Sequence, residues 1–111
     1  MFRVSWSSSF GCRDLNLVVM DPVQGTRVPT TNVNQNCLSC VPNPFEEVVI
    51  SNPVSGGTYR YNALDNAAAA CACSAGMVQS RFDVYKSGVI VQSNPASSLC
   101  DLFTQSFSFT Y

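Results

Sequence analysis

Residues 1–10, MFRVSWSSSF, alternate between apolar and polar side chains. A period of two residues is typical of a β-strand with one buried face, because successive side chains of a strand point to opposite faces. We therefore expect an N-terminal strand. Its inner face would carry Phe2, Val4, Trp6 and Phe10, and its outer face Arg3, Ser5, Ser7 and Ser9.

The same alternation recurs along the chain between segments rich in Gly, Pro, Asp and Asn. Asp21-Pro22-Val23-Gln24-Gly25 supplies turn residues between two short strands, and Lys86-Ser87-Gly88 does so further on. Residues 32–45 show no period, which is typical of a loop. The expected strands cover residues 1–10, 15–19, 26–28, 46–51, 59–63, 81–85, 89–91 and 103–111.

Residues 65–79 break the alternation. Asp65 and Asn66 precede four alanines, which favours a short helix that is capped by Asp65 and ends near Gly76. An alanine-rich strand is the alternative. Eight strands with at most one short helix predict an all-β chain, an antiparallel β-sandwich or jelly roll. Because the 111 residues contain no linker or internal repeat, we expect residues 1–111 to form a single domain.

Six cysteines in so short a chain favour a disulfide framework made in an oxidising compartment. If consecutive strands run antiparallel, the connections alternate between the two ends of the sandwich. The short turns at 21–25, 52–57 and 86–88 then share one end, the lower pole, and all the cysteines share the other, the upper pole. The sequence does not select a pairing. The expected disulfide residues are Cys12, Cys37, Cys40, Cys71, Cys73 and Cys100.

Two other uses of the cysteines are less favoured. Cys37, Cys40, Cys71 and Cys73 could supply four thiolates to zinc, but C-x-C is an unusual half-site. The 37–40 spacing also matches a redox motif, but no helix is expected after it.

Catalysis is not expected. The chain has no histidine, which removes the usual general base. The adjacent Glu46 and Glu47 must point to opposite faces of their strand, so they cannot flank one glycosidic bond. We therefore expect no catalytic residues.

Acidic and amide side chains gather at strand ends of the upper pole and offer the oxygen ligands that calcium prefers. The rival interpretation is that acids end strands because strand ends are solvated, and the dense D-x-D-x-D spacing of a calcium loop is absent. We expect no cofactor, and calcium is the candidate that these acidic and amide residues offer. Its candidate ligands are Asp14, Asn16, Glu46, Glu47, Asp65 and Asp101.

Charged residues make up only 12% of the chain, and the net charge is -1. Without a basic cluster, we expect no binding to nucleic acid. The longest apolar run, 67–73, is far shorter than the roughly 20 residues that a membrane span needs. The cysteines favour an extracellular or cell-surface location. Because the N-terminal residues do not resemble a signal peptide, we expect a processed product or a segment of a longer precursor.

Val4-Ser5-Trp6, followed by DLNLVVMDPVQG at residues 14–25, resembles the YfaP-like family of bacterial extracellular β-sandwich modules. That family has a tryptophan strand and then D-L-D-L-x-V-x-D-P-x-G. The segments EVVI (47–50), GTYRY (57–61) and FDVYKSG (82–88) follow in the family's order. The resemblance implies an extracellular sandwich without known catalysis, similar to domains appended to secreted proteases and surface proteins. Asn16 stands where the family has its second Asp, and the cysteines and the alanine-rich segment are additions.

Together these features predict a structural module that acts through protein–protein contacts, as a repeat or subunit of an adhesin, filament or coat. The terminal strands, 2–10 and 103–111, carry neither the Lys nor the Pro that blunts an edge. We expect them to pair with copies of the protein or with neighbouring domains of a longer precursor. The candidate interface residues are Tyr85, whose ring we expect to be exposed, and Phe103, Phe107, Phe109 and Tyr111.

The alternative is an extracellular glycan- or peptide-binding module that uses the disulfide-tied loops. An aromatic platform for sugars would then be formed by Tyr59, Tyr61 and Tyr85. Trp6 falls on the same face of its strand as Phe2 and Val4, so we expect it in the core.

Overall fold

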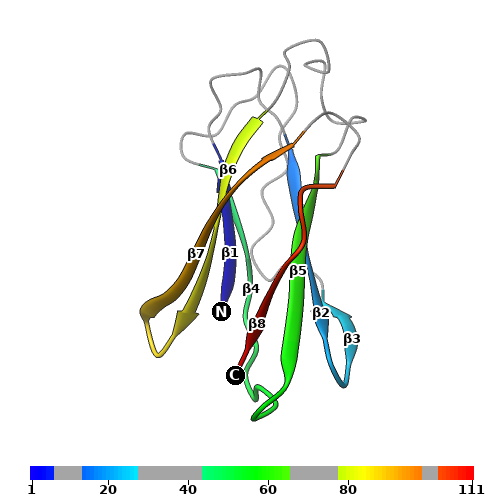
Figure 1. Ribbon diagram of the computed structural model, residues 1–111, viewed down its shortest axis with the longest axis vertical. Coiled ribbons are helices and arrows are strands. Elements are labelled where there is room, and N and C mark those ends of the chain that lie inside the picture. Colours follow the sequence, from blue (N-terminus) through cyan, green and yellow to red (C-terminus); the bar gives the residue numbers. More distant parts are fainter. Residues whose placement is uncertain (7–13, 28–43, 66–77, 99–102) are drawn as a thin grey trace.

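The computed structural model describes residues 1–6, 14–27, 44–65, 78–98 and 103–111, and these residues form eight strands and no helix. The strands make two antiparallel sheets of four strands each, which face one another (Figure 1). Sheet A has the order β4-β1-β6-β7, and sheet B has the order β3-β2-β5-β8. The strands are β1 (Phe2–Trp6), β2 (Leu15–Asp21), β3 (Gly25–Arg27), β4 (Phe45–Val48), β5 (Thr58–Asp65), β6 (Val78–Lys86), β7 (Val89–Ser98) and β8 (Phe107–Thr110).

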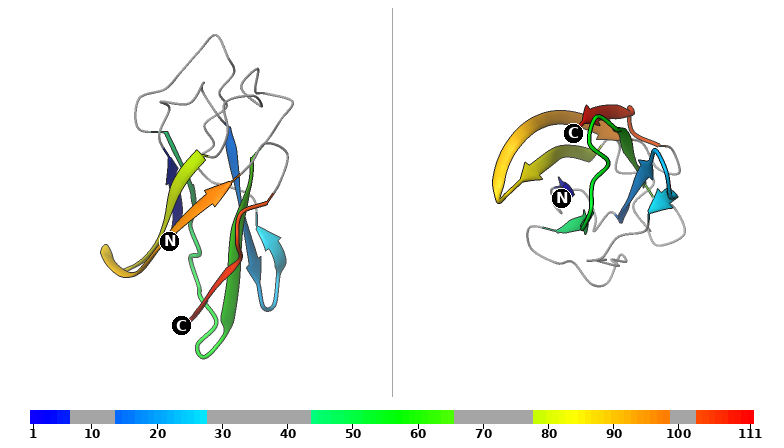
Figure 2. Two further views of the ribbon diagram at one scale, coloured as in Figure 1. Left: turned by 45° about the horizontal axis from the view of Figure 1, so that its top comes forward. Right: turned by 90° about the horizontal axis from the view of Figure 1, so that it is seen from below.

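The predicted antiparallel sandwich of eight strands is confirmed, and each strand overlaps one expected from the alternation. The largest difference is β7, which continues to Ser98 because it pairs with β6 along its whole length. The long β6–β7 hairpin curves away from sheet B (Figure 2). Residues 66–77, where a short helix is expected, lie outside the described residues; Asp65, its expected cap, is the last residue of β5.

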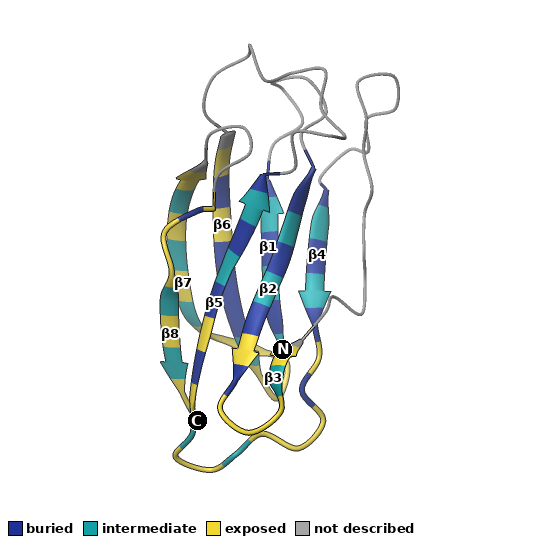
Figure 3. Ribbon diagram, turned by 90° about the vertical axis from the view of Figure 1, so that its right-hand side faces the viewer, coloured by how far each residue is buried: buried dark blue, intermediate teal, exposed yellow. Residues whose placement is uncertain are grey.

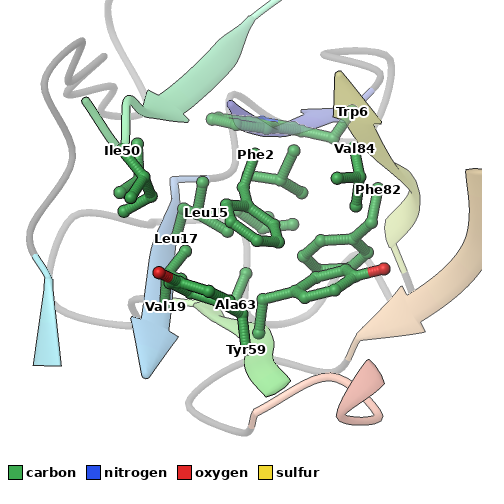
Figure 4. Close-up of a cluster of buried hydrophobic side chains, with 13 residues drawn as sticks. Phe2, Trp6, Leu15, Leu17, Val19, Ile50, Tyr59, Ala63, Phe82 and Val84 are labelled. Atoms are coloured by element: carbon green, nitrogen blue, oxygen red, sulfur yellow. The ribbon is translucent and has the colours of Figure 1, made fainter. Parts of the chain in front are cut away.

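The inward faces of both sheets build one hydrophobic core. Burial alternates along β2 and β5, as the bands in Figure 3 show. Trp6 is buried, as predicted (Figure 4). Burying each large apolar side chain contributes about 1.5–3 kcal/mol. The core consists of Phe2, Val4, Trp6, Leu15, Leu17, Val19, Val48, Ile50, Tyr59, Tyr61, Ala63, Phe82 and Val84.

Tyr59 and Tyr61 are core residues, so the expectation that they form a surface platform is wrong. Their rings lie 5.7 and 5.1 Å from the Phe2 ring, centroid to centroid. The Tyr59 hydroxyl accepts a hydrogen bond from the Val54 N–H at 3.0 Å, and the Tyr61 hydroxyl accepts one from Gln92 Nε2 at 2.6 Å. Both rings are on the inward face of β5, where each hydroxyl still finds a partner.

The three short turns lie at one end of the sandwich, as predicted for the lower pole (Figure 1). In the β2–β3 turn, Asp21 Oδ1 accepts hydrogen bonds from the N–H groups of Val23 and Gln24, at 2.8 and 3.0 Å. In the β6–β7 turn, Ser87 and Gly88 have φ values of 53° and 77°, the pattern of a type I′ hairpin.

The other strand ends define the upper pole. β1, β5 and β7 end there, and β2, β4 and β6 begin there, because Trp6 pairs with Ser80 and Leu15 with Asp65. All six cysteines lie outside the described residues, so the disulfide framework and its position stay predictions.

β1 lies inside sheet A, where it pairs with both β4 and β6. The expectation that the N-terminal strand has an exposed edge is therefore wrong. Periodicity indicates which face of a strand is buried, but it does not indicate which strands are its neighbours. The edges of the two described sheets are β4, β7, β3 and β8.

The alternation of residues 103–111 predicts that Phe103 shares a face with Phe107, Phe109 and Tyr111, and this prediction is wrong at the start of the segment. Phe103 is 57% exposed and Thr104 is buried. The reason is a pair of hydrogen bonds to Ala63: the Thr104 N–H donates to the Ala63 carbonyl at 2.8 Å, and Thr104 Oγ1 accepts from the Ala63 N–H at 3.0 Å. These bonds continue sheet B beyond the start of β8 and turn Phe103 outward.

Candidate functional site

Two buried carboxylates meet where β2 begins and β5 ends. Asp65 pairs with Leu15 across the two strands, which brings it close to Asp14, and the two aspartates are 0% and 1% exposed. Burial, and to a smaller extent the negative charge of Asp65, raise the pKa of Asp14 from 3.8 to about 6. Asp14 Oδ1 has no hydrogen-bond partner among the described residues. The structure thus brings two of the candidate calcium ligands, Asp14 and Asp65, close together.

The other candidate ligands are engaged elsewhere. Glu46 is buried and its Oε2 accepts a hydrogen bond from the Leu17 N–H at 2.8 Å, whereas Glu47 points outward and pairs with Arg3. Asn16 is half-buried on β2, and Asp101 lies outside the described residues. The described part of the chain holds no group of three or more His, Cys, Asp or Glu side chains that could bind a metal ion. Calcium binding stays a prediction.

The candidate interface residues are divided between two sheets. Phe107, Phe109 and Tyr111 are half-buried against the rim of the core along β8, and Phe103 is exposed before that strand. Tyr85 lies on the outer face of sheet A and is only half-exposed, because the Arg3 guanidinium lies 5.3 Å from its ring centroid. Tyr85 therefore belongs to a different surface from the other four.

The free side of β8 can be identified from the hydrogen bonds around Tyr111. Its N–H donates to the Gly57 carbonyl at 3.1 Å, and its carbonyl accepts from the Gly56 N–H at 2.8 Å, so the backbone of Tyr111 faces the β5 side. In an antiparallel pair, successive residues of a strand direct their backbone N–H and carbonyl groups alternately toward and away from the partner strand. The backbone groups of Ser108 and Thr110 therefore face away from β5. Both residues are exposed, and one of these outward groups, the Ser108 carbonyl, accepts a hydrogen bond from Gln92 Nε2 at 3.0 Å.

A groove of about 760 Å³ runs along the outer face of sheet A. The register explains its position. Ser5 pairs with Phe45 on one side and Arg81 on the other, so a short side chain lies between two long ones. Arg3 is two residues away on the same face, between Glu47 and Asp83. The alternation of β1 already indicates that Arg3 and Ser5 face outward, but only the sheet order shows what stands beside them.

Ion pairs and ring contacts hold the two arginines of this groove. Arg3 Nε donates to Glu47 Oε1 at 2.6 Å, and its guanidinium lies 4.7 Å from the Phe45 ring centroid. Arg81 Nη2 lies 2.8 Å from Asp83 Oδ2, and this hydrogen bond raises the pKa of Arg81. Among the residues that form and hold this groove, the sequence singled out only Glu47, as a calcium ligand, and Tyr85, as an exposed ring.

Comparison with protein-family models, with curated proteins and with solved structures found no match. The relation to YfaP-like modules therefore remains a resemblance between motifs. Within the described ranges, no helix is long and apolar enough to cross a membrane.

Proposed function

We propose that this chain is a non-catalytic structural module, secreted or on a cell surface, that works through protein–protein contact. The β8 edge of one copy pairs antiparallel with the β8 edge of a second copy. Such a contact has two-fold symmetry and closes on itself. It therefore makes a dimer, and this dimer would be the subunit or repeat from which an adhesin, filament or coat is built through further contacts.

The observation that carries the proposal is the outward-facing backbone of Ser108 and Thr110. The other three edges of the described sheets are less suitable. β3 is only three residues long, β4 is tied to β2 through Glu46, and β7 contains Pro95, which has no N–H to donate. β8 has neither a charged residue nor a proline.

The side chains of β8 support the same proposal. Phe107, Phe109 and Tyr111 are only partly buried at the rim of the core. A strand added beside β8 would cover their exposed parts while it pairs with the backbone of Thr110 and of Ser108, whose carbonyl would then accept from the new strand in place of Gln92 Nε2. Main-chain hydrogen bonds and buried apolar surface together are what strand addition uses for affinity.

The test is the oligomeric state of the intact protein and of two matched variants. Thr110→Lys places a charge on the β8 edge, and Thr26→Lys makes the same change on β3, the opposite edge of sheet B. Sedimentation should show a dimer for the wild type and for Thr26→Lys and a monomer for Thr110→Lys. A wild-type protein that stays monomeric at high concentration, or equal loss of association in both variants, would refute the proposal.

A further inference from the structure

The groove on the outer face of sheet A combines the features of a ligand site. Its volume of about 760 Å³ is within the range of roughly 300–1,000 Å³ that small-ligand pockets occupy. Arg3, Arg81, Gln79 and Ser5 line it with polar groups, and Phe45 and Tyr85 line it with aromatic rings. It lies on the sheet that does not contain β8, so it is independent of the proposed dimer contact.

The charges of the groove are arranged asymmetrically. The Arg81 side chain is 57% exposed, whereas its partner Asp83 is 3% exposed. The Arg3 side chain is 33% exposed, whereas its partner Glu47 is 14% exposed. The two ion pairs cancel in net charge, but the surface that a ligand meets consists mainly of guanidinium groups. A ligand with a carboxylate is therefore complementary to this surface.

The arginines are also held in place before any ligand arrives. Arg3 lies against the rings of Phe45 and Tyr85 while it pairs with Glu47. Arg81 Nε donates to both oxygens of Asp83, at 2.9 Å each, and Ser93 Oγ donates to Asp83 Oδ1 at 2.6 Å. Side chains that are already ordered lose less conformational entropy on binding.

The floor of the groove favours a saccharide over a peptide. β1 and β6 form this floor, and each of them pairs with a strand on both sides. Their backbone groups are engaged in sheet A, so an extended peptide cannot add to them by main-chain pairing. Side chains must provide the recognition. Planar guanidinium and amide groups can bind carboxylates and hydroxyls, and aromatic rings can cover the apolar face of a sugar.

We propose that this groove binds an acidic saccharide. The carboxylate of a uronic acid unit takes a hydrogen bond from the exposed edge of Arg81, and its hydroxyls bond to Ser5 and Gln79. The sugar ring lies in the hollow above Ser5, between Phe45 and Arg81.

The experiment titrates the intact protein with a short oligogalacturonate by calorimetry. A neutral malto-oligosaccharide and a short poly-glutamate peptide serve as comparison ligands. Saturable binding of the oligogalacturonate, with weaker or no binding of the other two, supports the proposal. Equal or tighter binding of the peptide, or no binding of the oligogalacturonate, overturns it.

Three variants locate the binding site. Arg81→Gln should weaken binding about tenfold, because a charge-assisted hydrogen bond is lost. Arg60→Gln, which removes an exposed arginine from sheet B, should leave the affinity unchanged. Ser5→Leu keeps both guanidinium groups but fills the hollow, so it should abolish binding even if Arg81→Gln perturbs folding. Equal loss in Arg60→Gln, or full affinity in Ser5→Leu, contradicts the proposed site.

Discussion

Glu46 and Leu17 join the two sheets: the buried Glu46 carboxylate on β4 accepts a 2.8 Å hydrogen bond from the backbone N–H of Leu17 on β2. Within the described residues, β3 pairs with β2 only at residues 19–21. Leu17 therefore lies beyond the reach of β3, and a side chain from sheet A supplies the acceptor. This contact closes the side of the sandwich opposite β7 and β8.

Glu46→Ala should destabilise the protein by about 3 kcal/mol, because a buried backbone N–H loses its acceptor and a cavity forms. Glu46→Gln should cost about 1 kcal/mol, since the amide oxygen can still accept the bond. Urea denaturation measures both values. The neighbouring Glu47→Ala removes a partly exposed ion pair and should cost less than about 1 kcal/mol. Equal effects at positions 46 and 47 would show that the link between the sheets does not matter.

The Asp14–Asp65 pair predicts an unusual dependence of stability on pH. The pKa of Asp14 is raised from 3.8 to about 6 in the folded state, mainly by burial. The folded state therefore favours the protonated form, and this contribution is fully present below about pH 4 and is lost as pH rises through 6.

Asp14→Asn should remove this loss. The variant should be more stable than the wild type by about 1–2 kcal/mol at pH 7.5, because a neutral amide avoids the cost of burying a charged carboxylate beside Asp65. At pH 4 the two proteins should be nearly equal. Thermal unfolding from pH 4 to 8 tests this, in the presence of a chelator so that bound calcium does not change the result. A variant that is less stable at pH 7.5 would contradict the account.

Gln92 restrains the β8 edge. Its amide donates to the Ser108 carbonyl at 3.0 Å and to the Tyr61 hydroxyl at 2.6 Å. Gln92→Ala should lower the stability by about 1 kcal/mol, since Tyr61 retains a bond from Asn94 at 3.2 Å. It should also strengthen dimerisation several-fold, because the Ser108 carbonyl becomes available to the second copy. Sedimentation of the variant measures this change, and weaker association would count against the assigned edge.

The sequence predicted the strands because alternation depends on local residues, and Phe2, Val4 and Trp6 are buried as their phase indicated. It could not predict the neighbours of β1, which depend on the order of strands distant in the chain. The groove was missed for the same reason: Arg3 and Ser5 become part of a site only when β4 and β6 lie beside them. The strand-end acids were interpreted as solvated or metal-binding, but the fold buries Asp14 and Asp65 together.

The most direct test of the dimer is the hydrogen exchange of the Thr110 amide at low and high protein concentration. This N–H faces away from β5, so it should exchange fast in the monomer and slowly once a second β8 strand accepts its hydrogen bond. The Thr26 amide on β3 is the control and should not depend on concentration. Protection of Thr110 that rises with concentration is the predicted result. Association without any change at Thr110, or no association at all, would contradict the account.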